Sequence, residues 1–123
     1  MVNKEVIFSF QEKYTLEERR LKFKEIECYL KDCVPIIIEE TRDPSQNTSP
    51  QINTFLVSAS TTFGHMSEKI RQRRVDNPEK AIFFLLNGKI AVNLTTTLAD
   101  VYEQYKHEDG FLYVSYSYEH VWG

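Results

Sequence analysis

Apolar and polar positions repeat with a helical period in some stretches of the chain and with a strand period in others. Residues 10–14 and 16–31 predict a short and a longer helix. Each begins near a hydroxyl residue, Ser9 or Thr15, followed three residues later by a glutamate, a spacing typical of a capping box. The longer helix gathers its apolar residues on one face: Leu16, Phe23, Ile26 and Leu30. That face needs a surface to pack against.

Apolar stretches rich in β-branched and aromatic residues predict five strands: 34–39, 54–58, 81–86, 89–92 and 111–116. Asn87-Gly88 predicts a tight hairpin between the third and fourth strands. The last strand follows a turn at Asp109-Gly110 and is apolar on both faces, which favours an interior position in the sheet. Thr62 and Thr97 cap two further helices. Their apolar residues have helical spacing: Phe63, Met66 and Ile70, then Leu98, Val101, Tyr102 and Tyr105.

The resulting order is ααββαββαβ, an α+β chain in which a five-strand mixed sheet carries a crossing helix, as in the ubiquitin β-grasp. Residues 41–51 are polar or turn-forming and predict a surface loop. Residues 117–123 have no period, so we expect a flexible tail. Its terminal Gly123 would offer an unhindered carboxylate to a narrow active site on another protein.

Composition narrows the class of protein further. The 123 residues, 41% of them hydrophobic, fit one domain with its own core. The longest apolar run, residues 81–86, is too short to span a bilayer, and the N-terminus lacks the form of a signal peptide. We therefore expect a soluble intracellular protein with Cys28 and Cys33 as free thiols. The net charge of −3 argues against nucleic-acid binding.

The chain carries no motif of an enzyme active site. Gly-rich phosphate loops, nucleophile elbows and paired C-x-x-C motifs are absent from the sequence. The histidines at positions 65, 107 and 120 have no sequence partner that marks a nucleophile or a metal site. Arg71, Arg73 and Arg74 are typical of a solvated helix end, with a phosphate-binding patch as the alternative. We assign no catalytic residue, metal site or cofactor.

Several segments, taken in order, resemble the autophagy-related protein 8 family of ubiquitin-like modifiers, which includes GABARAP and microtubule-associated protein light chain 3. They are residues 10–12, 17–20, 34–39, 55–57, 70–74, 81–88 and 108–113. The last, Glu108-Asp109-Gly110-Phe111-Leu112-Tyr113, is more similar to the light-chain branch. The resemblance runs from about residue 8 to Gly123.

This resemblance implies one ubiquitin-like domain over residues 1–123. It divides into a helical extension (1–31), a β-grasp core (34–116) and a tail (117–123). Gly123 would be joined to phosphatidylethanolamine through an activating enzyme and a conjugating enzyme, and a cysteine protease would process precursors and remove the lipid. The chain, ending at Gly123, would be the form ready for activation. We expect a cytoplasmic protein that the lipid holds at the autophagosomal membrane.

The resemblance also implies a groove for adaptor and cargo-receptor peptides of the form aromatic-x-x-aliphatic, bound as an extra strand beside residues 54–58. The residues that would receive the aromatic side chain, here called the aromatic set, are Ile26, Pro35, Ile37, Leu56 and Phe111, with Lys22 at the rim. Those that would receive the aliphatic side chain, the aliphatic set, are Phe55, Val57, Met66 and Ile70, with Arg73 alongside. This chain departs from the family pattern at Cys33, Thr54, Ser58, Thr61 and Lys69.

Two other functions stay open. The chain could modify a protein lysine, as in the autophagy-related protein 12 family, which also tends to end in Trp-Gly. It could also be a peptide-binding domain that is never conjugated. The two capping boxes and Glu17-Glu18-Arg19-Arg20 favour the lipid-linked modifier. Part of each pocket set must also be core, since β-grasp strands bury one face.

Overall fold

The computed structural model describes residues 8–27, 31–40, 52–73 and 82–118, with the backbone alone for 52–55, 73 and 118. Its elements are α1 (Ser9–Lys13), α2 (Leu16–Glu27), β1 (Cys33–Glu40), β2 (Ile52–Ser58), α3 (Phe63–Arg73), β3 (Ile82–Leu86), β4 (Ile90–Ala91), α4 (Leu98–Tyr105) and β5 (Leu112–Tyr118). The predicted order and the α+β class are confirmed. The predicted loop 41–51 lies outside the described residues, as do Cys28, Leu30, Arg74, His120 and Gly123.

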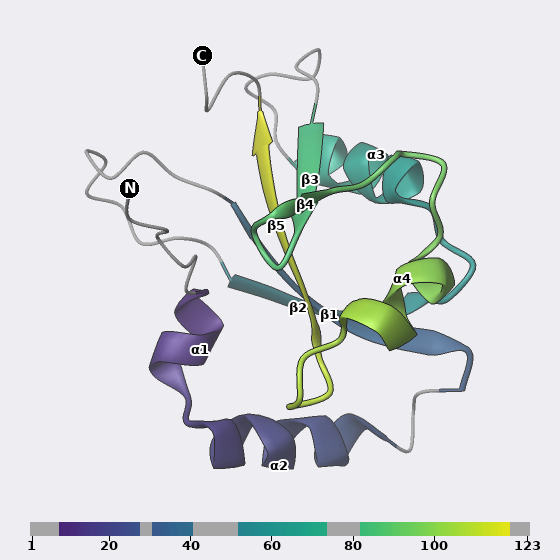
Figure 1. Ribbon diagram of the computed structural model, residues 1–123. Helices are drawn as coiled ribbons and strands as arrows, with labels where there is room; N and C mark the ends of the chain where they lie inside the picture. The colour runs from purple at the N-terminus through teal and green to yellow at the C-terminus, as the bar shows by residue number, and fades with distance from the viewer. Residues whose placement is uncertain (1–7, 28–30, 41–51, 74–81, 119–123) are drawn as a thin grey trace, which may run out of the picture.

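Within the described residues, five strands form one sheet in the order β2-β1-β5-β3-β4. β1 and β5 run parallel, and the other neighbours are antiparallel. The predicted interior strand is therefore the central one. The tail prediction is wrong for its first two residues, because β5 continues through Ser117 and Tyr118, which pair with Phe83 and Ile82 of β3. Figure 1 shows α1 and α2 on one side of the sheet and α3 and α4 on the other.

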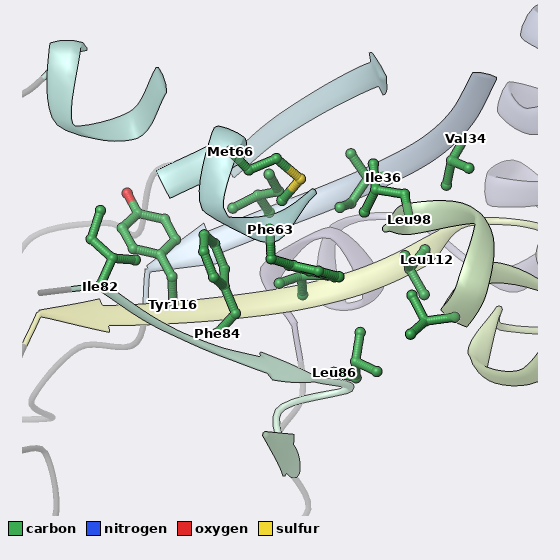
Figure 2. Close-up of a cluster of buried hydrophobic side chains, with 13 residues drawn as sticks. Val34, Ile36, Phe63, Met66, Ile82, Phe84, Leu86, Leu98, Leu112 and Tyr116 are labelled. Atoms are coloured by element: carbon green, nitrogen blue, oxygen red, sulfur yellow. The ribbon is translucent and has the colours of Figure 1, made fainter. Parts of the chain in front are cut away.

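The main core lies between the sheet and the helices α3 and α4 (Figure 2). Alternate residues of β1, β3 and β5 point into it, as the period of two requires. Three aromatic rings form a row through this core: Phe84 packs against Phe63 at 5.4 Å and against Tyr116 at 6.4 Å between ring centroids. The spacing of Phe63, Met66 and Ile70 thus places the inner face of α3 as predicted.

A second core lies on the opposite face of the sheet, under α1 and α2. Its buried members are Phe8, Phe10, Ile37, Phe111 and Tyr113, and Tyr14, Phe23 and Ile26 pack against them. Phe23 and Ile26, two of the four residues predicted for the apolar face of the longer helix, therefore pack on this core. Because helices cover both faces, β1 and β5 read as nearly continuous apolar runs in the sequence.

Local signals place most helix ends and turns correctly. Thr15 and Glu18 form the predicted capping box: the N–H of Thr15 donates to Glu18 Oε1 and the N–H of Glu18 donates to Thr15 Oγ1. Thr62 accepts from the N–H of His65, and Thr97 from that of Asp100. In the hairpin, Asn87 and Gly88 have φ of 53° and 73°. These positive angles are those of a type I′ turn.

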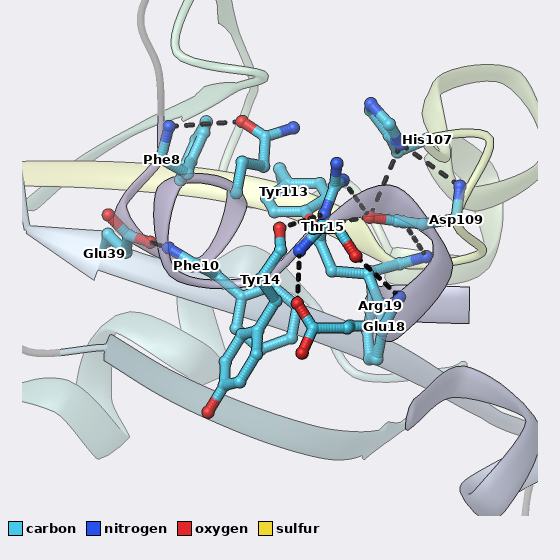
Figure 3. A network of polar contacts seen from close by, with 12 residues as sticks. Phe8, Phe10, Tyr14, Thr15, Glu18, Arg19, Glu39, His107, Asp109 and Tyr113 are labelled. Atoms are coloured by element: carbon cyan, nitrogen blue, oxygen red, sulfur yellow. Dashed lines mark hydrogen bonds and ion pairs between the residues drawn. The ribbon is translucent and has the colours of Figure 1, made fainter. Parts of the chain in front are cut away.

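The capping box predicted for Ser9 and Glu12 is wrong, because α1 begins at Ser9 and its N-cap is Phe8, whose N–H donates to Gln11 Oε1 at 3.2 Å. The carboxylate of Glu39 in β1 accepts from the N–H of Ser9 at 2.8 Å and from that of Phe10 at 3.1 Å. A carboxylate at a helix N-terminus satisfies donors that have no partner inside the helix. Glu39 therefore fastens α1 to the sheet (Figure 3).

Candidate peptide-binding site

The candidate site is built around β2, the outermost strand of the sheet on one side within the described residues. Its inner edge pairs with β1, where Leu56 lies opposite Pro35 and Val57 opposite Val34. A strand with one unpaired edge can accept an added strand through its backbone groups. Cross-strand partners share a face, so Leu56 lies on the side of α1 and α2, and Val57 on the side of α3.

The aromatic set gathers on the α2 side of the sheet. Ile37 and Phe111 belong to the second core with exposed fractions of 0% and 1%, and Ile26 packs beside them. Pro35 is fully buried, whereas Leu56 remains 42% exposed. The structure thus brings these residues together, with Leu56 as their exposed member. At the rim, the Lys22 ammonium lies 4.3 Å from the centroid of the Tyr14 ring, a cation–π contact.

The aliphatic set gathers on the other side of the sheet. Met66 is buried in the main core, and Val57 and Ile70 pack against it from partly exposed positions. The side chains of Phe55 and Arg73 lie outside the described residues, although the backbone places Phe55 in β2 and Arg73 at the end of α3. Met66 is therefore a core residue, and Val57 and Ile70 form the accessible part of the set.

The placement of the two sets on opposite sides of β2 matches the spacing of an aromatic-x-x-aliphatic peptide. In an extended strand, residues i and i+3 point to opposite faces and lie roughly 10 Å apart. A peptide paired with β2 would therefore turn its aromatic residue toward α2 and its aliphatic residue toward α3.

A buried charge network fixes α2 against the turn that precedes β5. Arg19 Nη1 donates to Asp109 Oδ2 at 2.7 Å, and the Tyr113 hydroxyl donates to the same oxygen at 2.6 Å. Asp109 Oδ1 accepts from the N–H of Phe111 at 2.9 Å. The Asp109 side chain is completely buried, and Figure 3 shows it at the centre of these contacts. The ion pair thus positions the helix that carries Lys22 and Ile26.

This network shifts the pKa values of Tyr113 and Arg19. Burial, then the hydrogen bond to the Asp109 carboxylate, raises the pKa of Tyr113 well above its ordinary value. Desolvation alone would lower the pKa of Arg19, but contacts with Tyr113 and Asp109 outweigh it and raise the pKa. His107 Nδ1 lies 3.1 Å from the Asp109 nitrogen and 3.4 Å from its Oδ2. These two contacts exclude each other, because Nδ1 either accepts a hydrogen bond or carries a proton.

Sequence reasoning missed Arg19, although its spacing could have revealed it. Arg19 precedes Phe23 by four residues and Ile26 by seven, so it lies on the buried face of α2. A charged residue in the middle of such a face indicates a buried partner. For Asp109, the sequence pattern predicted only a place in a turn. Gly110 was correctly placed in that turn, and its φ of 100° is one that glycine readily adopts.

The fold and the site define the class of protein. One mixed sheet with its central parallel pair, a crossing helix and two added N-terminal helices is a ubiquitin-like β-grasp. The structure superimposes on the crystal structure of Trypanosoma brucei ATG8 with a TM-score of 0.78 and 28% identity, covering 96% of this chain and 100% of that one.

Sequence comparison then gives the family. The family model described as autophagy protein Atg8, ubiquitin-like, matches residues 18–123. Autophagy-related protein 8 of Candida glabrata is 32% identical over 117 residues, 94% of this chain and 96% of that protein. Autophagy-related protein 8d of Arabidopsis thaliana is 34% identical over 119 residues, 95% and 96% of the two chains. This chain belongs to the Atg8 family of ubiquitin-like autophagy proteins, whose members are modifiers rather than enzymes.

Two negative observations concern the described residues alone. None of their helices is both long enough and apolar enough to span a bilayer. None of their His, Cys, Asp and Glu side chains forms a cluster of three or more that could hold a metal ion. Cys33 is a free thiol, as predicted.

Proposed function

We propose that this chain is an autophagy modifier conjugated through Gly123 to phosphatidylethanolamine. An activating enzyme would adenylate the carboxylate and take it as a thioester, a conjugating enzyme would receive it, and the lipid amine would attack that thioester. A cysteine protease would later remove the lipid. The protein would be cytoplasmic before conjugation and held at the autophagosomal membrane after it. The family match that extends to residue 123 supports this proposal.

We further propose that the edge of β2 binds adaptor and cargo-receptor peptides. The observation that carries this proposal is the position of the two apolar sets on opposite faces, beside the edge of β2 that pairs with no strand among the described residues. The peptide backbone would pair with β2, its aromatic side chain would approach the aromatic set near Leu56, and its aliphatic side chain would approach Val57 and Ile70. Lys22 and Arg73 are assigned to the rims of the two sets.

Reconstitution with an activating enzyme, a conjugating enzyme and phosphatidylethanolamine vesicles, followed by mass spectrometry, tests the conjugation. The wild type should gain the mass of the lipid. Gly123→Ala, or deletion of Gly123, should block the reaction and change stability by less than about 0.5 kcal/mol. Transfer to a protein lysine would point to the autophagy-related protein 12 type of modifier. No thioester at all would favour a peptide-binding domain that is never conjugated.

Calorimetric titration with an aromatic-x-x-aliphatic peptide tests the groove. Leu56→Arg places a charge where the aromatic ring should pack, and losing such an anchor costs about 2 kcal/mol, so affinity should fall more than tenfold. Lipidation should persist, because it needs the tail and the fold. Cys33 and Thr54 stand where the family usually has basic residues, so binding of peptides with acidic flanks should be less sensitive to salt than in typical family members. Equal affinity for both proteins would remove the groove assignment.

A further inference from the structure

The most deeply buried members of the aromatic set are already covered by side chains of this chain. Phe111, which would form part of the floor of the aromatic site, contacts two phenylalanine rings in edge-on geometry. Phe10 lies at 5.4 Å with an interplanar angle of 71°, and Phe23 at 5.9 Å with an angle of 81°. Phe10 is itself buried in the second core, whereas Phe23 is only partly buried. Phe23 is thus the covering ring that lies nearer to solvent.

The ring of Phe23 rests directly on the backbone of Gly110. A Cβ atom at Gly110 would lie only 2.5 to 2.6 Å from three ring carbons of Phe23, so the ring occupies the space that a side chain would need. Gly110 has a φ of 100°, which already favours glycine. Gly110 and Phe111 therefore form the floor of an aromatic site, and the Phe23 ring packs on this floor.

Phe23 also comes from the helix that bounds the predicted groove. It directly follows Lys22 and precedes Ile26 by three residues, so Phe23 and Ile26 lie on the same face of α2. An edge-to-face contact at 4.5 to 7 Å is the geometry that a peptide's aromatic residue would seek with Phe111. The two rings would compete for one surface.

We propose that Phe23 is an internal occupant of the aromatic site, and that it must turn away from Gly110 and Phe111 before the aromatic residue of a peptide can enter. This inference rests on the proposed peptide groove and assigns to it an autoinhibitory side chain. Binding then requires a conformation with Phe23 displaced, and the apparent affinity falls with the fraction of molecules in that conformation. Phe23 thereby selects for peptides whose aromatic residue replaces its contacts well.

Titration of variants with two synthetic peptides tests the proposal. One peptide carries Trp and Leu three residues apart, and the other has Ala in place of Trp. Phe23→Ala should bind the Trp peptide about three- to tenfold more tightly than wild type, since an aromatic pair contributes roughly 0.5–1.5 kcal/mol. The affinity of Phe23→Ala for the Ala peptide should not exceed that of wild type. Leu21→Ala is the matched control on the same helix. Because Leu21 is 63% exposed, this substitution should leave the affinity for both peptides unchanged.

Nuclear magnetic resonance supplies a readout that does not depend on affinity. The Gly110 protons lie against the Phe23 ring and should be shielded by it in the wild type. Phe23→Ala should remove this shielding, and adding the Trp peptide to wild type should shift the same signals as the ring leaves. Circular dichroism checks the fold of each variant, and Phe23→Leu replaces Phe23→Ala if the latter unfolds.

The outcomes separate this inference from the proposed groove. If wild type binds the Trp peptide, Leu56→Arg does not, and Phe23→Ala binds equally or more weakly than wild type, then Phe23 is a wall of the site and the inference is overturned while the groove stands. If Leu56→Arg binds as well as wild type, or if no variant binds, the groove fails and the inference fails with it. Tighter binding by Phe23→Ala with loss of the Gly110 shielding supports both.

Discussion

Replacing Asp109 by Asn would test whether the buried ion pair holds α2 on the sheet. The substitution preserves size but removes the charge that Arg19 Nη1 contacts at 2.7 Å. The amide oxygen can still accept from the N–H of Phe111, but the amide nitrogen would then face the donors of Arg19 and Tyr113. Arg19, whose side chain is only 10% exposed, would be left with a buried and unpaired charge.

The burial of this pair sets the expected size of the effect. Removing one partner of a buried ion pair costs about 3–5 kcal/mol, mostly because the other charge remains desolvated. Small domains are stable by roughly 5–15 kcal/mol, so Asp109→Asn should remove a large fraction of the total. With a urea slope of about 1.5 kcal/mol per molar, a loss of about 3 kcal/mol lowers the unfolding midpoint by roughly 2 M. The double variant Arg19→Met with Asp109→Asn should recover part of this loss.

Urea unfolding followed by circular dichroism measures these differences. Glu103→Gln is the matched control, because it makes the same acid-to-amide change in the Lys106–Glu103 pair, where Glu103 is 79% exposed. That variant should lie within about 0.5 kcal/mol of wild type. If the free energy of unfolding of Asp109→Asn lay within about 1 kcal/mol of the wild-type value, the reasoning would be refuted. The same holds if the double variant lost more stability than its two single variants lose together.

Two pH dependences follow from the shifted groups. Burial raises the pKa of Tyr113 in the folded protein. The stability that this shift contributes is therefore complete below the unfolded-state pKa of about 10 and is lost as pH rises above that value. Between about pH 8 and pH 11, the urea midpoint should decline less steeply in Tyr113→Phe than in wild type. The pKa of Glu18 is lowered by its hydrogen bonds with Thr15, so its contribution is present above the ordinary value of 4.5 and is lost as pH falls through the folded value. Glu18→Gln should keep the capping geometry and make the acid side of the midpoint curve shallower; identical curves for wild type and variant would contradict this assignment.

The elements that sequence reasoning placed correctly are those determined by neighbours in the chain. The capping box at Thr15, the caps at Thr62 and Thr97, and the Asn87-Gly88 hairpin each depend on residues within about three positions. Such local preferences act whatever the distant chain does, and here the tertiary structure agrees with them. The element order followed from these signals, and the order identified the fold.

The errors have the opposite origin. Glu39, thirty residues from Ser9, accepts from two N–H groups at the start of α1, and no local pattern indicates this contact. The end of β5 was placed too early because Ser117 and Tyr118 have no apolar period; pairing with β3 extends the strand. Pairing with a distant strand overrides weak local propensity. For the aromatic set, the apolar pattern placed Phe23 on the packed face of the longer helix but did not indicate that its ring covers Phe111.

The segment 109–113 links the stability of the domain to the candidate site, because its successive residues take part in both. The carboxylate of Asp109 holds Arg19, Gly110 leaves room for Phe23, and Phe111 contacts the same ring. Arg19 and Phe23 stand one helical turn apart on α2, so the ion pair fixes the backbone from which the Phe23 ring extends. In the proposed mechanism, rotation about χ1 would move the Phe23 ring away from Phe111 while the ion pair stays intact. Peptide entry in the proposed mechanism therefore requires a change of the Phe23 rotamer and does not require α2 to leave the sheet. Such a change takes picoseconds to nanoseconds at exposed positions and longer at packed ones.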